Sequence, residues 1–251
     1  MDRMYIHGIV CQVFGREFSY YASQSPHCVT VSWLPQGLHD TPQLLRERLQ
    51  QAIDEVQQKK EDKLLIHEPD ALVLGYGLCS NGVVGLKTHD TPLVLPRTDD
   101  CIALFLGSQQ RYLEAFAQYS GTYWLNNGWI ESAFIPSRAM LASKRAQYAE
   151  QYGEDNADFL MEMDMQWTNH YQYCGYIQSP VYQAEENIAL ARDMAAYHGW
   201  NLVELAGDGR MIRQLVNGEW PEAEYLVCPP HHEIQATFDE RKIMAVPCAG
   251  G

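Results

Sequence analysis

The chain has 251 residues, of which 46% are hydrophobic and 20% charged, and its 32 acidic and 18 basic residues give a net charge of −14. This composition excludes a disordered chain and is typical of one large globular domain or two small ones. The acidic balance, without a Lys or Arg cluster, predicts no nucleic-acid partner. No apolar run reaches the roughly 18 residues of a membrane span, so we expect a soluble, cytoplasmic protein with no membrane partner.

In the first half of the chain, apolar and β-branched runs predict strands, and apolar residues at helical spacing predict helices. The expected strands are residues 5–14, 28–34, 71–76 and 93–95. The clearest helix is 41–60, where Thr41 is a potential cap and Pro42 suits the first turn. Its apolar stripe consists of Leu45, Leu49, Ala52, Ile53 and Val56. Shorter helices are expected over 101–106 and 109–119.

The second half begins with an aromatic segment, residues 123–182, which we expect to be helical without a clear register. The elements expected after it are a helix over 182–198, a strand over 201–205, a helix over 209–217, and strands over 225–228 and 243–246. This alternation predicts an α/β fold with mostly parallel sheets and flanking helices. We expect a single intertwined unit over 1–251, with possible lobes 1–120 and 121–251 around a central cleft.

The seven cysteines are too few for a disulfide-stapled miniprotein, and their odd number indicates a reducing compartment. Five of them lie at or just past predicted strands, namely Cys11, Cys79, Cys101, Cys228 and Cys248. The carboxyl ends of parallel strands meet at one sheet edge, which is where ligands bind in open α/β sheets. Sulfurs that are distant in the sequence are therefore expected to meet in space.

Core packing is the alternative use of a free cysteine, and it suits Cys28, Cys174 and Cys228. Cys79 lies instead in the glycine-rich turn GLCSNG, residues 77–82. Cys101 lies in a predicted first helical turn, where backbone N–H groups lower the pKa of a thiol. The acidic pair before it opposes this effect, so a thiolate there requires a nearby cation such as Arg97 or a bound metal.

Any metal site must be assembled from remote segments, because the sequence has no CxxC or HExxH motif. Three thiolates with one open coordination position would be typical of a catalytic centre. A fourth ligand is left open among His7, His231, His232 and Cys248, although a His pair after two prolines is typical of a solvated loop. The aromatic segment 122–131, which includes Trp129, either walls a pocket or packs in the core.

The segments GYGLCSNGVVGLKT, PLVLPRTDDCIALFLGSQQRY and GTYWLNNGWIES resemble domain-of-unknown-function family sixteen-thirty-eight. Members of this family occur in bacteria and archaea, often encoded beside corrinoid-dependent methyltransferases for methylated amines. The resemblance covers most of the chain and is densest over 75–131. It strengthens a common set of residues: Cys11, Cys79, Cys101, Arg97, Asp100, Arg111 and Tyr112. One departure is Asp99–Asp100, where the family pattern has His–Asp, so no role of that His carries over.

These observations predict that Cys11, Cys79 and Cys101 bind a 4Fe-4S cluster or a zinc ion with one position open to a small anionic substrate. The reaction expected is that of a lyase or transferase in one-carbon metabolism. Predicted catalytic residues are Asp100, Glu17 and Arg97, the arginine holding the anion and the carboxyls orienting ligands or moving protons. The predicted substrate-binding residues are Arg111, Tyr112, Gly77, Asn81 and Trp129.

Two other functions remain open. The first is an accessory protein that docks on a corrinoid protein or a methyltransferase and catalyses nothing itself. The second is a metal-free transferase or lyase in which Cys101 is the nucleophile.

Overall fold

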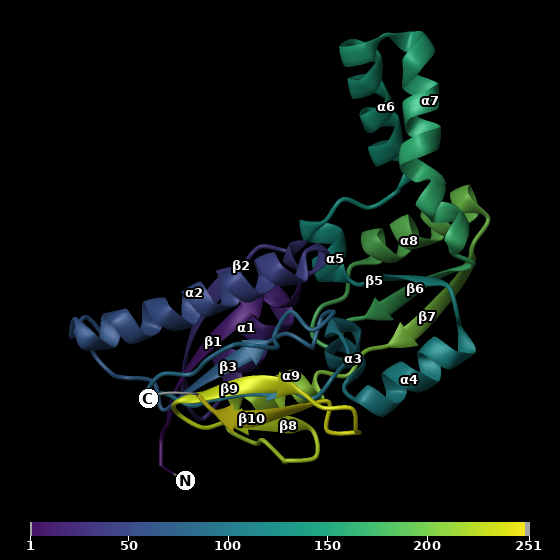
Figure 1. Ribbon diagram of the computed structural model, residues 1–251. Helices are drawn as coiled ribbons and strands as arrows, with labels where there is room; N and C mark the ends of the chain where they lie inside the picture. Colours follow the sequence, from purple (N-terminus) through teal and green to yellow (C-terminus); the bar gives the residue numbers. More distant parts are fainter. Residues whose placement is uncertain (1, 249–251) are drawn as a thin grey trace.

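The computed structural model describes residues 2–248, so the ends of the expected unit, residue 1 and residues 249–251, lie outside the described residues. Strands and helices alternate along the chain (Figure 1). The strands are β1 (Tyr5–Cys11), β2 (Cys28–Leu34), β3 (Ala71–Gly75), β4 (Leu93–Pro96), β5 (Thr122–Leu125), β6 (Tyr173–Gln178), β7 (Asn201–Ala206), β8 (Tyr225–Cys228), β9 (His232–Ala236) and β10 (Ile243–Pro247). The helices are α1 (Gly15–Gln24), α2 (Pro42–Glu61), α3 (Cys101–Leu106), α4 (Gln109–Gln118), α5 (Asn127–Ser132), α6 (Arg138–Tyr152), α7 (Glu154–Met165), α8 (Glu185–His198) and α9 (Arg210–Val216).

The main sheet has the strand order β2-β1-β3-β4-β8, in which the first four strands are parallel and β8 runs antiparallel to β4. β3 and β4 consist entirely of buried residues, as a parallel sheet covered on both faces requires. The predicted apolar stripe of α2 is buried against the core of this sheet. Pro42 opens the helix, but the Thr41 side chain makes no capping hydrogen bond.

A second sheet, β5-β6-β7, is entirely parallel and has its own smaller core with α8. β9 and β10 form an antiparallel hairpin beside the main sheet. The predicted α/β fold with mostly parallel sheets is therefore confirmed. β8, which comes from the last part of the chain, completes the sheet begun by β1, because its backbone pairs with β4.

Helices α6 and α7 form a hairpin that projects from the rest of the molecule (Figure 1). Each buries a single residue, Leu141 in α6 and Ala157 in α7. Over residues 2–248, every helix is too short or too polar to cross a membrane.

The first predicted strand is wrong in its length, because β1 ends at Cys11 rather than at residue 14. Residues Gln12–Phe14 form a short 3-10 turn that leads into α1. The apolar character of this turn serves packing rather than strand pairing. The Phe14 ring stacks on that of Phe105 with 4.4 Å between centroids, and the carbonyl of Val13 lies directly against Gly128.

The expectation that residues 123–182 are helical is also wrong in part, since the segment includes most of β5 and all of β6. Both are short strands with aromatic residues, which have a high preference for strands. Their pairing partners lie far away in the sequence, so the local pattern did not reveal them. The strands and helices predicted elsewhere are confirmed, with ends that shift by up to three residues.

We expect Leu45→Ala to lower the free energy of unfolding by about 2–5 kcal/mol, because Leu45 is fully buried and packs against Gly82 in the turn that holds Cys79. Urea unfolding followed by circular dichroism measures this change. The matched control is Leu44→Ala, which removes a side chain that is 38% exposed and should change stability by less than about 0.5 kcal/mol. Equal effects of the two variants would contradict the packing described.

Candidate functional site

Three cysteines from distant parts of the chain line one cavity of about 440 Å³. Cys11 is the last residue of β1, Cys79 lies in the turn after β3, and Cys101 begins α3 after β4. Because β1, β3 and β4 are neighbouring parallel strands, their carboxyl ends lie at the same edge of the sheet. The Sγ atoms of Cys79 and Cys101 are 3.5 Å apart.

Two backbone hydrogen bonds tie the turn after β3 to the segment after β4. The amide of Leu78 donates to the carbonyl of Thr98 at 2.8 Å, and the amide of Cys79 donates to the carbonyl of Asp99 at 3.0 Å. These two bonds extend the pairing of the strands beyond their ends. They hold the loop after β3 beside the loop after β4, where the sulfurs of Cys79 and Cys101 face one another.

The turn itself has an unusual backbone. Cys79, Ser80 and Asn81 have φ values of 44°, 57° and 65°, so three consecutive non-glycine residues are left-handed. This conformation costs about 1–2 kcal/mol for each such residue. Backbone strain of this kind is concentrated at functional sites, where the surrounding structure holds it in place.

The other walls of the cavity are mostly aromatic and come from the second half of the chain as well as the first. The lining residues are Cys11, Val13, His39, Cys79, Ser80, Asp99, Asp100, Cys101, Ile102, Phe105, Tyr112, Thr122, Tyr123, Trp124, Asn126, Trp129 and Tyr171. Trp129 is held by the capping side chain of Asn126, whose Oδ1 accepts the Trp129 amide at 2.8 Å. The predicted wall function of segment 122–131 thus has a structural basis, although core packing accounts for part of it.

Two of the thiols, Cys11 and Cys101, have raised pKa values, which favours their neutral form. Burial raises the pKa of Cys11 to about 12, with a further contribution from the charge of Cys101. The pKa of Cys101 is also raised, first by its hydrogen bond with Cys79 and then by burial. Beside them, burial and the three neighbouring thiols raise the pKa of Tyr76. Its buried hydroxyl makes no hydrogen bond within normal geometric limits, although it lies close to Cys11.

Two carboxyl groups stand at the same edge. Asp100 caps α3, and its Oδ1 accepts the amide of Ile102 at 2.7 Å. Burial raises the pKa of Asp100, against the effect of that amide and of the Tyr112 hydroxyl. Asp99 is bound on both oxygens, because it pairs with Lys242 and accepts the side-chain amide of Gln109.

The two arginines that the sequence predicts to hold an anion, Arg97 and Arg111, do not line the cavity. Arg97 is buried, and its guanidinium is used to satisfy backbone carbonyl groups, namely those of Glu222, Tyr225, Arg241 and Ile243. Arg111 donates in the same way to the carbonyls of Leu106 and Ala206. Neither lines the cavity, because each is committed to holding loops and helix ends together.

The remaining predicted residues divide into two groups. Asp100, Tyr112 and Trp129 line the cavity with the cysteines. Glu17, Asn81 and Gly77 do not line it. Glu17 is buried in α1 with its Oε2 unpartnered, Asn81 is exposed at the far side of the turn, and Gly77 supports the turn through its close packing.

None of the candidate fourth ligands lies at the cavity. His7 bonds to Thr30 and Ser32 on β2, and His231 pairs with Asp90. His232 begins β9 rather than a solvated loop, and its ring contacts the carbonyl of Pro230. Because β8 runs antiparallel to β4, its last residue, Cys228, lies opposite Leu93 at the start of β4, which is the other edge of the sheet. Cys248 lies near Cys228.

A histidine, His39, also lines the cavity. It is not among the candidates predicted from the sequence. It lies in the short turn Leu38–Asp40 before α2, with its ring centroid 5.6 Å from that of Trp129. No local pattern marks it. Over residues 2–248, no three His, Cys, Asp or Glu side chains are arranged so that they hold a single metal ion.

The chain matches the protein family of unknown function DUF1638 over residues 33–216, which is well over half of its length. The chain belongs to the DUF1638 family. The matched region contains Cys79 and Cys101, whereas Cys11 precedes it. Neither the curated proteins nor the solved structures contain a match.

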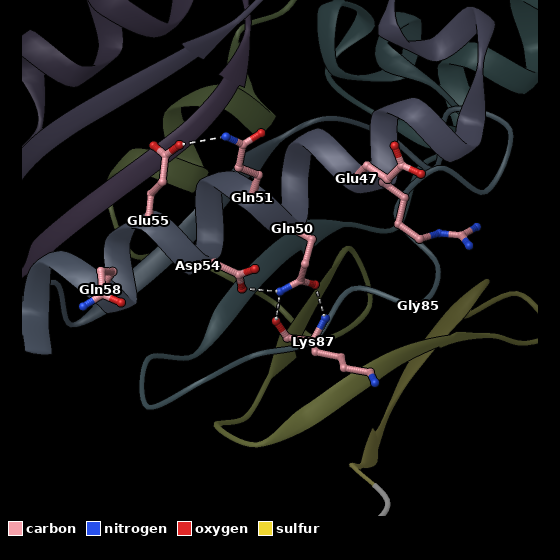
Figure 2. Close-up of a pocket in the computed structure, with 9 residues that line it drawn as sticks. Glu47, Gln50, Gln51, Asp54, Glu55, Gln58, Gly85 and Lys87 are labelled. Atoms are coloured by element: carbon pink, nitrogen blue, oxygen red, sulfur yellow. Dashed lines mark hydrogen bonds between the residues drawn. The ribbon is translucent and has the colours of Figure 1, made fainter.

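This DUF1638 protein has another hollow, of about 680 Å³, along the exposed side of α2 (Figure 2). Several of its polar side chains bond to one another, such as Gln51 to Glu55 and Gln50 to Asp54. The side-chain oxygen of Gln50 accepts a hydrogen bond from the backbone N–H of Lys87 at 2.8 Å. Its side-chain nitrogen donates to the carboxylate of Asp54 at 2.8 Å, and Figure 2 shows both bonds. The lining residues of this hollow include no thiol and no aromatic ring, in contrast to those of the cysteine cavity.

Gly77→Ala should destabilise the DUF1638 protein by about 1–3 kcal/mol, because a Cβ at Gly77 would lie 2.5 Å from the backbone carbonyl carbon of Asp100. Thermal unfolding monitored by circular dichroism gives the change. Gly15→Ala is the matched control, since a Cβ there meets nothing within 4 Å and should leave stability unchanged or raise it by up to about 1 kcal/mol. A harmless Gly77→Ala would mean that the two loops are not packed as described.

Glu17→Gln should stabilise the protein near neutral pH by about 1–3 kcal/mol, because burial raises the pKa of Glu17 and its charged form is poorly compensated. A carboxyl with a raised pKa contributes stability at low pH and loses it as pH rises through that pKa. The gain should therefore disappear towards about pH 4. Melting temperatures across this pH range test it, with the exposed Glu55→Gln as control; a constant difference would contradict the assignment.

Proposed function

We propose that the cysteine cavity is the active site of an enzyme that acts on a small molecule in one-carbon metabolism, with Cys11, Cys79 and Cys101 as ligands of an iron–sulfur cluster or a zinc ion. The observation that carries this proposal is the meeting of three thiols from three chain segments at one cavity, with the Sγ atoms of Cys79 and Cys101 3.5 Å apart. Thiolates are the preferred ligands of both metal centres.

The electrostatics of the cavity support a metal rather than a free nucleophile. No Lys or Arg is among its lining residues, and burial raises the pKa of Cys11 and Cys101. Thiols in such surroundings stay protonated and unreactive near neutral pH. A bound cation reverses this, because it deprotonates a coordinating thiol outright. The metal-free mechanism with Cys101 as nucleophile has no such source of positive charge.

The Tyr76 hydroxyl gives a second reason. A buried hydroxyl without a partner costs about 1–3 kcal/mol, and this one lies close to Cys11. A neutral thiol is a weak acceptor, whereas a thiolate accepts a strong hydrogen bond. Ionisation of Cys11 by a metal would therefore give Tyr76 its missing partner and orient the ligand, as residues around metal sites commonly do.

The choice between zinc and a cluster depends on how the third thiol takes part. The spacing of Cys79 and Cys101 suits two ligands of one ion, but residues 2–248 contain no group of three donors around one point. Zinc binding would therefore require the Cys11 side chain to turn towards the pair. A 4Fe-4S cluster is less demanding, because it takes each cysteine on a different iron. With three protein ligands, either centre leaves one position that supplies Lewis-acid chemistry.

We further propose that the cavity is a cleft between two lobes. The chain has two separate hydrophobic cores, and the lining residues come from both sheets or from the loops beside them. The lobes correspond roughly to 1–120 and 121–251, but β8 returns from the second part to the main sheet, which makes the unit intertwined. The cysteines of residues 2–248 are unpaired, which fits the proposed cytoplasmic location.

In this cleft, Asp100 and Tyr112 are placed to hold or move a proton, since both line the cavity and their hydrogen bond couples the carboxyl to the phenol. The raised pKa of Asp100 brings it towards the range in which a carboxyl is an effective acid or base. Arg97 and Arg111 lie outside the lining and donate to backbone carbonyl groups, so this proposal gives them no role in the proton transfer.

The second candidate is an accessory protein that docks on a corrinoid protein or methyltransferase. The α6–α7 hairpin favours it, because it projects from the body (Figure 1). It also carries exposed apolar side chains, among them Met140, Phe159 and Met163. Exposed apolar groups of this size are typical of interaction sites. Capture of such a partner with equal strength by wild type and by Cys79→Ala would favour this role over catalysis.

Metal analysis tests the enzyme proposal. Protein purified without oxygen, with all thiols reduced, should contain about one cluster or one zinc ion per chain, and a cluster should absorb broadly near about 400 nm. Cys79→Ala and Cys101→Ala should lose most of it, whereas Cys28→Ala, a half-buried cysteine outside the cavity, should keep it.

Two results would overturn the proposal. One is wild-type protein that contains no metal and takes up none when reconstituted with ferrous iron and sulfide or with zinc. The other is unchanged metal content in both cavity variants. Circular dichroism melts of each variant show whether a loss of metal reflects unfolding instead.

A further inference from the structure

The charge of the cysteine cavity points to the kind of ligand that it admits. Its lining residues include two aspartates, no Lys or Arg, and one histidine, His39, whose Nε2 lies 3.3 Å from the carboxylate of Asp40. Asp99 already has a cation, because Lys242 pairs with it from outside the lining. Asp100 has no ion-pair partner within residues 2–248, and its carboxyl group lies near the amides of Ile102 and Ala103 and the hydroxyl of Tyr112. One carboxyl group at the cavity is therefore free to meet a positive charge from a ligand.

The aromatic side chains of the cavity form walls at steep angles to one another. The rings of Tyr123 and Tyr171 are 5.4 Å apart between centroids and perpendicular, with an interplanar angle of 90°. The indole N–H of Trp129 donates to the Tyr123 hydroxyl at 3.4 Å, which fixes a third ring beside them. All three are only partly buried, so ring surface remains accessible from the cavity.

Aromatic faces carry a negative electrostatic potential, and several of them around one space attract a cation whose charge is spread over methyl groups. An alkylated ammonium ion has this property and has low hydration, so it loses little on leaving water. A carboxyl group lining the same cavity adds direct charge attraction. A metal cation with a strongly held water shell, or an anion, gains far less from such walls.

We propose that the cavity binds a small alkylated ammonium ion, with Tyr123, Trp129 and Tyr171 around its methyl groups and Asp100 facing its charge. The inference rests on the proposed function in one respect, since it names the substrate class of the same cavity. A volume of about 440 Å³ holds such an ion together with whatever the thiols bind. It also replaces the anionic substrate expected from the sequence, whose arginines lie elsewhere.

Three probes of nearly the same shape and different charge test the proposal: choline, its neutral carbon isostere dimethylbutanol, and the anion trimethylacetate. Isothermal titration calorimetry on protein isolated under reducing, anaerobic conditions should show choline binding at least about 10-fold more tightly than dimethylbutanol. Trimethylacetate should bind more weakly than either. Equal affinity for choline and dimethylbutanol, tighter binding of the anion, or no binding of choline would each overturn the inference.

Variants assign the effect to the named residues. Asp100→Asn keeps a good capping side chain for α3 but removes the charge, so the preference for choline over dimethylbutanol should fall by about 5-fold or more. Trp129→Leu should weaken choline binding by about 5-fold to 30-fold. Tyr20→Leu, an exposed ring outside the cavity, is the control and should change nothing. Unchanged choline affinity in both cavity variants would overturn the assignment.

The metal content of the same samples separates this inference from the proposed function. If protein that takes up no metal still binds choline, the proposed cation site is supported and the proposed metal centre is overturned. Metal-loaded protein without a preference for choline would do the reverse.

Discussion

The site depends on one constraint, the parallel pairing of β1 with β3 and of β3 with β4. It brings three carboxyl ends to one edge of the sheet, and each end carries a cysteine. The amides of Leu78 and Cys79 then continue the pairing past the last residues of the strands. Without these bonds, the left-handed turn that carries Cys79 would have little to hold it, because its backbone conformation is unfavourable for residues other than glycine.

The same constraint creates an electrostatic problem that a metal would resolve. Three thiols and a tyrosine hydroxyl lie close together at this edge, and burial and the neighbouring thiols raise the pKa values of Cys11, Cys101 and Tyr76. In a purely structural core, apolar side chains of similar size would pack there without that cost. Groups with strongly shifted pKa values that line a cavity are typical of functional sites. This is why we assign the chemistry to this edge and not to the polar hollow along α2.

Arg97 shows that tertiary contacts can give a structural role to a residue whose position in the sequence suggests a binding role. Arg97 follows a buried strand next to the acidic pair, and its position in the sequence indicates an anion site. In the fold, the returning segment of β8 and β10 passes close by and brings unpaired backbone carbonyls. Buried carbonyl groups need donors, and the guanidinium has five, so Arg97 serves the scaffold. The cavity is left with acidic and aromatic walls, which changes the charge expected of its ligand.

By itself, the sequence determined the α/β class, the stripe of α2, the strand at Ala71–Gly75 and the position of Cys79 and Cys101 just past buried strands, because these features have a local period or a local turn signal. Only the tertiary structure decided the rest: the strands within the aromatic segment, the antiparallel β8 that takes Cys228 and Cys248 to the other edge, and the presence of His39 in the cavity. Each depends on partners that are distant in the chain, and such partners leave no mark on the residues beside them.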